Sequence, residues 1–280
     1  MVFLLHDFII EEHIKQALKE DIGFADISTD YIEADGKILK ATMNSREEGI
    51  LCGISVVKKV FEILDSTLQI KTFLKDGDKI SKGQDIATIE GNARAVLTGE
   101  RLALNYVQRM SAIATLTNQY VKVLEPYKVT ITETRKTTPN FRLFEKYAVT
   151  VGGATPHRFS LCDCVMLKDN HIALCGGIKQ AVETVRKHIS HTHKIEIETD
   201  TLEQVKEAIE AGADIIMLDN MSPDTMREAI KIINGRAIVE ASGQVNIKTL
   251  EDIAKTGVDV ISTSAITAKA GSLDIGLDIK

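Results

Sequence analysis

Cys164-Val165-Met166-Leu167-Lys168-Asp169-Asn170-His171 shows the pattern that decides the fold, a short apolar run that leads into polar or charged residues. The pattern recurs in the second half of the chain, with apolar runs at residues 129–131, 195–197, 215–218, 237–239 and 258–261. Helical sequence separates the runs, near residues 141–150, 176–189, 201–211, 223–233 and 247–256. Strands that alternate with helices at this spacing indicate βαβ units and a parallel sheet.

Polar residues at the ends of these runs are the first candidates for function. A parallel α/β barrel gathers the carboxyl ends of its strands around one mouth. If the runs are barrel strands, six candidates converge there: Arg135, Lys136, Lys168, Glu198, Asp219 and Ser242. Such a set predicts a basic pocket with two carboxylates and a phosphate cradle.

Two basic motifs indicate an anion site. Arg135 and Lys136 are adjacent at a strand end, where their repulsion is unfavourable without an anion, so an anion-binding loop is favoured over a solvated turn. Gly152-Gly153 precedes His157-Arg158, and the glycines allow close backbone approach or positive φ. Arginine presents a planar fork that matches a carboxylate or phosphate. Together the motifs predict a clamp for a dicarboxylate or a phosphate.

Two carboxylates are candidates for metal binding. Glu196 and Glu198 lie two residues apart and share one face of their strand, with Glu198 as the functional candidate and Glu196 as a buried structural partner. Asp219 ends the next strand in the same way. Carboxylates on neighbouring strand ends suit Mg²⁺ or a developing cation, although each alone also fits a helix cap or a salt bridge.

Short Ser/Gly turns follow the last two predicted strands, Ala241-Ser242-Gly243-Gln244 and Ser262-Thr263-Ser264-Ala265. Phosphate sites in these barrels recur at the last strand ends, where backbone N–H groups point at the anion. These turns therefore predict a phosphate site.

The first half of the chain has a different organisation. Residues 38–52, 68–74 and 85–90 are predicted strands, and residues 54–65 a helix. A long helical section follows from about residue 93 to residue 124, with a predicted break near Met110-Ser111. Runs of strands with one helix indicate an α+β domain.

Composition excludes several classes of protein. A net charge of −6 over 280 residues gives no basic footprint for nucleic acid. No stretch approaches the roughly 18 uninterrupted apolar residues of a membrane span. Four cysteines without a CxxC pair favour reduced thiols in the cytosol.

The motifs, taken in order, resemble those of the quinolinate phosphoribosyltransferase family, also called nicotinate-nucleotide pyrophosphorylase (carboxylating). The resemblance spans nearly the whole chain. It is carried by Asp21-Ile22-Gly23, Arg46–Gly49, Gly99–Asn105, Ser111–Thr115, Thr134–Pro139, Phe144–Ala148, His157-Arg158, Lys168–His171, Ala213–Asn220, Glu240–Gly243 and Leu273–Leu277.

The resemblance implies an incomplete, TIM-like parallel α/β barrel with an N-terminal α+β sandwich-like domain. The implied domains are residues 1–107 and a barrel at residues 108–267, with residues 268–280 returning to the first domain. The family forms dimers in which one subunit's N-terminal domain covers the partner's barrel mouth, so we expect a cytoplasmic homodimer with Arg101 donated across the interface.

The resemblance also implies a reaction between quinolinate and phosphoribosyl pyrophosphate that gives nicotinate mononucleotide, pyrophosphate and CO2, in NAD biosynthesis. The expected quinolinate residues are Arg101, Arg135, His157, Arg158 and Lys168, with Lys136 at the boundary with the pyrophosphate. Ser242, Gly243 and Ser264 would hold the ribose 5-phosphate. Glu198 and Asp219 would bind Mg²⁺ and the ribose hydroxyls, and Lys136, Lys168, Glu198 and Asp219 form the expected catalytic set.

Alternatives remain at this point. Ala154, Gln244 and Ser264 stand where the family often has glycine. Pro156 before His157 also resembles a paralogous group associated with molybdenum transport. Lys168 alone is compatible with a Schiff-base aldolase or a surface residue. A phosphate-binding module without turnover has no need of the pair Glu198 and Asp219.

Overall fold

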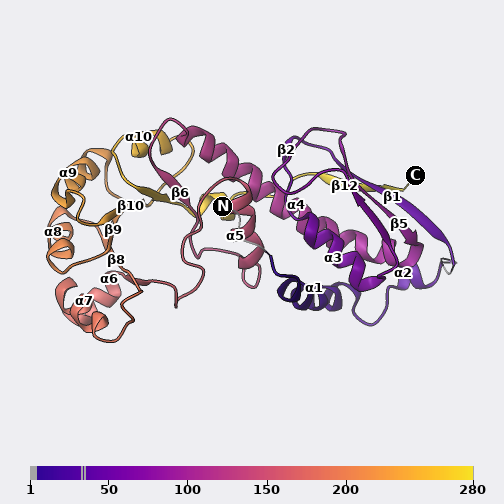
Figure 1. Ribbon diagram of the computed structural model, residues 1–280, viewed down its shortest axis with the longest axis horizontal. Coiled ribbons are helices and arrows are strands. Elements are labelled where there is room, and N and C mark those ends of the chain that lie inside the picture. Colours follow the sequence, from indigo (N-terminus) through magenta and orange to yellow (C-terminus); the bar gives the residue numbers. More distant parts are fainter. Residues whose placement is uncertain (1–4, 33, 35, 280) are drawn as a thin grey trace. The chain divides into compact units, whose positions relative to one another are not determined.

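The computed structural model describes residues 5–32, 34 and 36–279, which form two compact units. The N-terminal unit contains the described residues up to Asn118, together with Leu143–Gly153 and the described residues from Ala270 onward. The barrel unit contains Gln119–Arg142 and Ala154–Lys269. Figure 1 shows the helices and strands of both units, coloured along the chain.

Six parallel strands form the sheet of the barrel unit, in the order β6-β11-β10-β9-β8-β7. They are β6 (Thr130–Thr132), β7 (Val165–Leu167), β8 (Ile195–Thr199), β9 (Ile215–Asp219), β10 (Ile238–Ser242) and β11 (Val260–Ser262). Each strand coincides with one predicted apolar run, so this prediction is confirmed. Within the described chain β6 and β7 are the two sheet edges and do not pair with each other, and the barrel is therefore incomplete, as expected.

Helices connect these strands and cover the outside of the barrel (Figure 1). They are α6 (Asp169–Cys175), α7 (Ile178–Arg186), α8 (Leu202–Glu210), α9 (Pro223–Ile233) and α10 (Leu250–Ala254). A short helix, α11 (Ala265–Ala268), follows the last strand of the barrel sheet, β11. Local sequence fixes several helix starts. Thr201 caps α8 by accepting the N–H of Gln204, and Ser222 caps α9 ahead of Pro223.

The pleat of the strands sorts apolar from polar residues. Ile195 and Ile197 of β8 are fully buried, whereas Glu196 and Glu198 line cavities inside the barrel. This alternation follows from the two-residue period of a strand. Strand β8 therefore presents its carboxylates to the cavities and its isoleucines to the buried layer on the opposite face.

The N-terminal unit contains an antiparallel sheet in the order β12-β1-β5-β3 and a two-stranded sheet β2-β4. The strands are β1 (Ile38–Ser45), β2 (Gly49–Ile50), β3 (Gln69–Thr72), β4 (Lys79–Ile80), β5 (Asp85–Asn92) and β12 (Ile275–Ile279). The helices are α1 (Asp7–Ile22), α2 (Ile27–Asp30), α3 (Ile54–Leu64), α4 (Ala93–Leu124) and α5 (Arg142–Val151). The last strand of the chain, β12, pairs antiparallel with β1.

The predicted helix break near Met110-Ser111 is wrong, because α4 runs continuously from Ala93 to Leu124. Met110 and Ser111 are fully buried, and the Ser111 hydroxyl bonds to the backbone of Cys52 instead of interrupting its own helix. The units also divide after Asn118, inside α4, whereas the expected boundary lay after residue 107.

The Gly152-Gly153 pair has a packing role in the N-terminal unit. A Cβ on Gly152 would lie 2.6 Å from the carbonyl oxygen of Ala114, so only glycine allows this approach of α5 to α4. Gly153 has a φ of 102° and turns the chain out of α5. The conformational freedom predicted for these glycines thus serves to pack the end of α5 against α4 and to turn the chain.

Among the described residues, every helix is too short or too polar to cross a membrane.

Candidate active site

Two adjoining pockets open at the carboxyl ends of the barrel strands. The outer pocket has a volume of about 450 Å³ and the inner pocket of about 280 Å³. Predicted residues that line the outer pocket are Lys136, Lys168, Glu198, Asp219, Ser242, Gly243 and Ser264. Predicted residues that line the inner pocket are Arg135, Lys136, His157, Arg158, Lys168 and Ser242. The fold therefore brings together every candidate of the barrel unit.

Arg101 is the remaining candidate. It lies on α4 in the N-terminal unit, where its side chain is exposed. The residues that line the two pockets of the barrel unit do not include it.

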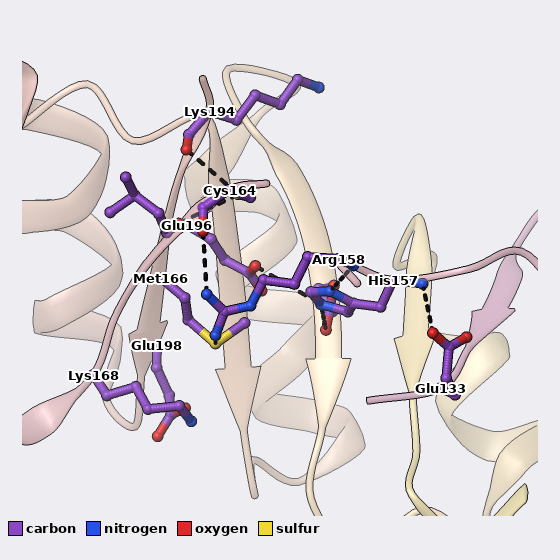
Figure 2. Close-up of polar contacts among 11 residues, drawn as sticks. Glu133, His157, Arg158, Cys164, Met166, Lys168, Lys194, Glu196 and Glu198 are labelled. Atoms are coloured by element: carbon purple, nitrogen blue, oxygen red, sulfur yellow. Dashed lines mark hydrogen bonds and ion pairs between the residues drawn. The ribbon is translucent and has the colours of Figure 1, made fainter. Parts of the chain in front are cut away.

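Lys168 stands at the edge of both pockets. It precedes α6 as the N-cap residue, and its backbone N–H donates to Nδ1 of His171 at 3.1 Å. Its ammonium group forms an ion pair with Glu198 of the neighbouring strand β8 (Figure 2). The Lys168 side chain is 44% exposed, so an anion that enters from solvent can compete with Glu198 for it.

Gly243 shapes the floor of the outer pocket. It has a φ of 91°, and a Cβ there would lie 2.2 Å from Oδ1 of Asn220. Asn220 itself donates its backbone N–H to the carbonyl of Ser242 at 3.0 Å and its amide to Asp219 at 2.7 Å. The glycine therefore allows the ends of β9 and β10 to approach closely. The Asn220 amide that fits beside it holds the Asp219 carboxylate in place.

The turn after β11 completes the outer pocket. Ser262, Thr263 and Ser264 line it, and Ser264 is the N-cap residue of α11 with a φ of −79°. The Thr263 hydroxyl accepts the N–H of Ala265 at 3.1 Å and donates to Val245 O at 3.2 Å. Hydroxyls therefore surround this end of the pocket, which suits a phosphate.

Two arginines reach the inner pocket. Arg158 donates to the carbonyl of Cys164 at 3.1 Å and to Sδ of Met166 at 3.2 Å, which fixes its guanidinium against β7 (Figure 2). The Nε of Arg135 is buried without a hydrogen-bond partner among the described residues. Arg142 donates to the carbonyl of Arg135 at 3.5 Å and steadies its loop. The pocket thus offers fixed donors to a carboxylate.

Buried carboxylates lie around His157, a residue that lines the inner pocket, and Figure 2 shows Glu133 and Glu196 among them. The backbone N–H of His157 donates to Glu133 at 3.1 Å, and its Nε2 lies 3.4 Å from Glu240 and 3.8 Å from Glu196. Burial, then the nearby Glu240, raises the pKa of Glu196 to about 7. For His157, burial lowers the pKa, but the carboxylates of Glu240, Glu196 and Glu133 outweigh this and raise it.

Sequence reasoning missed part of this cluster. Glu196 was predicted to be buried and structural, and it is fully buried. Glu133 and Glu240 were not singled out, although both are buried. Glu240 lies two residues before Ser242, as Glu196 lies two before Glu198, so strand periodicity was the signal for an inward-facing acid.

Comparisons with known proteins match one family over most of the chain. Residues 26–111 match the family model for the quinolinate phosphoribosyl transferase N-terminal domain, and residues 113–278 match that for its C-terminal domain. A probable nicotinate-nucleotide pyrophosphorylase [carboxylating] of Bacillus subtilis is 44% identical over 260 residues, covering 93% of this chain and 90% of the relative.

Two further proteins extend the comparison. The mitochondrial quinolinate phosphoribosyltransferase [decarboxylating] 2b of Nicotiana tabacum is 38% identical, covering 96% of this chain and 82% of the relative. The structure of the nicotinate-nucleotide pyrophosphorylase from Francisella tularensis aligns with a TM-score of 0.93 at 38% identity, covering 99% of this chain and 98% of that one.

We predict that Gly243→Ala destabilises the barrel more than Gly257→Ala. Both glycines have positive φ, which costs an alanine about 1–2 kcal/mol. Only at Gly243 would the Cβ meet neighbouring atoms, because none lies within 4 Å of the Cβ position at Gly257. Displacement of Asn220 should add about 1–3 kcal/mol. Equal unfolding free energies of the two variants in urea would contradict this account.

Proposed function

This chain belongs to the quinolinate phosphoribosyltransferase family, and we propose that it joins quinolinate to phosphoribosyl pyrophosphate. The products are nicotinate mononucleotide, pyrophosphate and CO2, in a step of NAD biosynthesis. The observation that carries this proposal is that cations, carboxylates and hydroxyls converge at one barrel mouth of an acidic chain. Quinolinate carries two negative charges and phosphoribosyl pyrophosphate carries several, so both require such a local concentration of cations.

The inner pocket is the proposed quinolinate site. Arg135 and Arg158 present guanidinium groups there, and Lys168 stands at its edge. Guanidinium groups bind carboxylates in two-point contacts. His157 belongs to the same wall. A carboxylate of quinolinate would compete with Glu198 for the Lys168 ammonium group.

The outer pocket is the proposed phosphoribosyl pyrophosphate site. Ser242, Gly243 and Ser264 would hold the 5-phosphate through hydroxyl and backbone N–H groups. Lys136 lines both pockets, which suits a contact with the pyrophosphate at the boundary between the substrates. Asp219 would accept the ribose hydroxyls.

Mg²⁺ is the proposed cofactor. Glu198 and Asp219 lie on paired strands and line the same pocket, and Mg²⁺ prefers carboxylate oxygens and retained waters. When bound, Mg²⁺ supplies charge neutralisation for the leaving pyrophosphate. Because Lys168 pairs with Glu198, Asp219 is the more accessible ligand until quinolinate draws Lys168 away.

The proposed mechanism relies on position and charge. Departure of pyrophosphate leaves positive charge on the ribosyl carbon, which Glu198 and Asp219 stabilise from below. The ring nitrogen of quinolinate, held by Arg135 and Arg158, then bonds to that carbon. The resulting pyridinium accepts the electron pair of the adjacent C–C bond as CO2 leaves, and a proton from solvent replaces the carboxylate. Lys136, Lys168, Glu198 and Asp219 form the proposed catalytic set, and no covalent enzyme intermediate is needed.

A Schiff-base role for Lys168 fits the geometry less well. A Schiff base requires the neutral amine, whereas an ion pair with Glu198 uses the ammonium form. The proposed role of Lys168 is therefore to bind a carboxylate.

The proposed assembly is a cytoplasmic homodimer with a shared active site. Arg101 is exposed on α4 and provides the cation that one subunit would donate to its partner's inner pocket. Its length and charge suit a carboxylate of quinolinate.

The reaction itself is the first test. Purified protein with quinolinate, phosphoribosyl pyrophosphate and Mg²⁺ should form nicotinate mononucleotide and CO2 in equal amounts, and EDTA should stop it. Nicotinate in place of quinolinate should react poorly, because it lacks the second carboxylate. If no nucleotide forms, the proposed function is wrong, and a role like that of the molybdenum-associated paralogues would become the better hypothesis.

Loss of a pocket cation should abolish most activity without unfolding the protein. We expect Arg135→Ala and Lys168→Ala each to lower kcat/KM about 30- to 1,000-fold. This corresponds to a loss of about 2–4 kcal/mol of transition-state stabilisation. Lys194→Ala is the control, because Lys194 is exposed and lines neither pocket. Full activity in the first two variants would refute their assignment.

Complementation tests the shared site. Arg101→Ala and Lys168→Ala proteins should each be inactive alone. When the two are co-expressed, mixed dimers should regain activity, because one of their two sites has neither substitution. If the mixture stays inactive while size-exclusion chromatography shows mixed dimers, Arg101 does not act across the interface.

A further inference from the structure

Residues 155–158, which we term the closing segment, lie beside β6 and reach β7 across the gap in the barrel. The Thr155 N–H donates to the carbonyl of Ile131 at 3.1 Å, beside β6. At the other end, Arg158 donates to the carbonyl of Cys164 and to Sδ of Met166, beside and within β7. The segment between them forms neither helix nor strand, so side chains must fix its course.

His157 is the anchor of the closing segment. Its backbone N–H donates to Glu133 at 3.1 Å. Its ring Nδ1 accepts the backbone N–H of Arg158 at 2.7 Å (Figure 2). Its Nε2 lies 3.4 Å from Oε1 of Glu240 and 3.8 Å from Oε2 of Glu196. Both ring nitrogens therefore face protein atoms in this conformation.

The bond at Nδ1 decides where the ring proton resides. An acceptor nitrogen carries no hydrogen, so the proton belongs on Nε2 and points at Glu240. The surrounding carboxylates favour a second proton, but a hydrogen on Nδ1 would meet the Arg158 N–H at 2.7 Å. The hydrogen bond therefore holds the ring in the Nε2–H form.

The same bond argues against a metal ion in this cluster. His157, Glu196 and Glu240 offer ligand atoms within 4.8 Å of one another. A metal on Nε2 would require a bare Nε2 and would move the hydrogen to Nδ1, where the Arg158 N–H already lies. The cluster is thus better suited to an Nε2–H of His157 that faces the Glu240 carboxylate than to a metal ion.

We propose that Glu240 is a positioning residue for the inner pocket: its carboxylate faces Nε2 of His157 at 3.4 Å, and this electrostatic contact holds the ring that anchors the closing segment and so places Arg158 at the inner pocket. The inference rests on the proposed function for its substrate. Glu240 contacts no substrate, since it lines neither the inner nor the outer pocket. It lines a third cavity, of about 450 Å³, on the other side of His157 and Arg158.

Both partners of the contact between Glu240 and the His157 ring are largely buried. Glu240 is 4% exposed and Glu196 is fully buried, so these two carboxylates are the groups that face Nε2 of the His157 ring in this conformation. A buried donor without an acceptor is costly, and the ring would turn to find another one. A turn of the ring would release the Arg158 N–H and loosen the guanidinium beside it. The effect should therefore fall on quinolinate and spare phosphoribosyl pyrophosphate.

Three substitutions at Glu240 separate the effect of side-chain length from the effect of negative charge. Glu240→Ala removes the acceptor and should raise the KM for quinolinate about 10-fold or more, with the KM for phosphoribosyl pyrophosphate within about 2-fold of wild type. Glu240→Gln keeps an oxygen at the same reach and should recover most of the quinolinate affinity. Glu240→Asp keeps the charge but is shorter, so it should share the alanine defect, and it carries the test if the alanine variant does not fold.

A spectroscopic measurement is independent of turnover. In the ¹⁵N-histidine spectrum of the wild type, His157 should show an unprotonated Nδ1 and a protonated Nε2, and Glu240→Ala should abolish this fixed tautomer. Glu183→Ala is the matched control, because Glu183 is exposed on α7 and lines none of these cavities. It should change neither the spectrum nor either KM.

Several outcomes would overturn the proposal. They are an unchanged quinolinate KM in Glu240→Ala, an equal rise of both KM values, a glutamine variant as defective as alanine, and a divalent metal bound by the cluster in the purified protein. If the wild type forms no nicotinate mononucleotide, the proposed function fails instead, and the tautomer measurement still decides whether Glu240 fixes the His157 ring.

Discussion

The site depends on the alternation of side chains along the parallel strands. Ile195 and Ile197 face the apolar layer beneath the helices, which leaves Glu196 and Glu198 inside the barrel. A shift of one residue in β8 would bury two carboxylates among the helices and expose the isoleucines, so the apolar layer enforces the register. The positions of the polar groups are therefore a consequence of hydrophobic packing on the opposite face.

Charge balance inside the barrel constrains the site in turn. Buried charges are tolerated only where they are paired or hydrogen-bonded. Glu198 pairs with Lys168, and the Glu240 carboxylate lies beside His157. Lys168 at the mouth thus has an internal partner that an anionic substrate can displace, whereas the acids around His157 hold the framework. Groups near the barrel mouth therefore bind the substrate, whereas groups deeper in the barrel hold other side chains in position.

The strands and the pocket residues could be predicted because both follow from local pattern. Apolar runs mark the strands, and the barrel geometry carries Lys168 and Asp219 to one mouth. The packing role of Gly152 and the continuity of α4 at Ser111 could not be predicted, because both depend on tertiary contacts made by residues distant in sequence. The same holds for the closing segment, whose anchors come from three different parts of the chain.

Residues 154, 244 and 264 are the positions at which the resemblance led us to expect glycine, and they differ in the backbone angles that they adopt. Gln244 adopts a φ of 49°, so a glycine there would relieve a left-handed conformation that costs an L-residue about 1–2 kcal/mol. Ser264 has a φ of −79°, and Ala154 does not adopt a positive φ, so neither position requires glycine. At Gly243 the approach of Asn220 excludes any Cβ, and glycine is retained. In this chain a left-handed backbone angle therefore does not exclude a side chain at residue 244, whereas the close approach of two strand ends excludes one at residue 243.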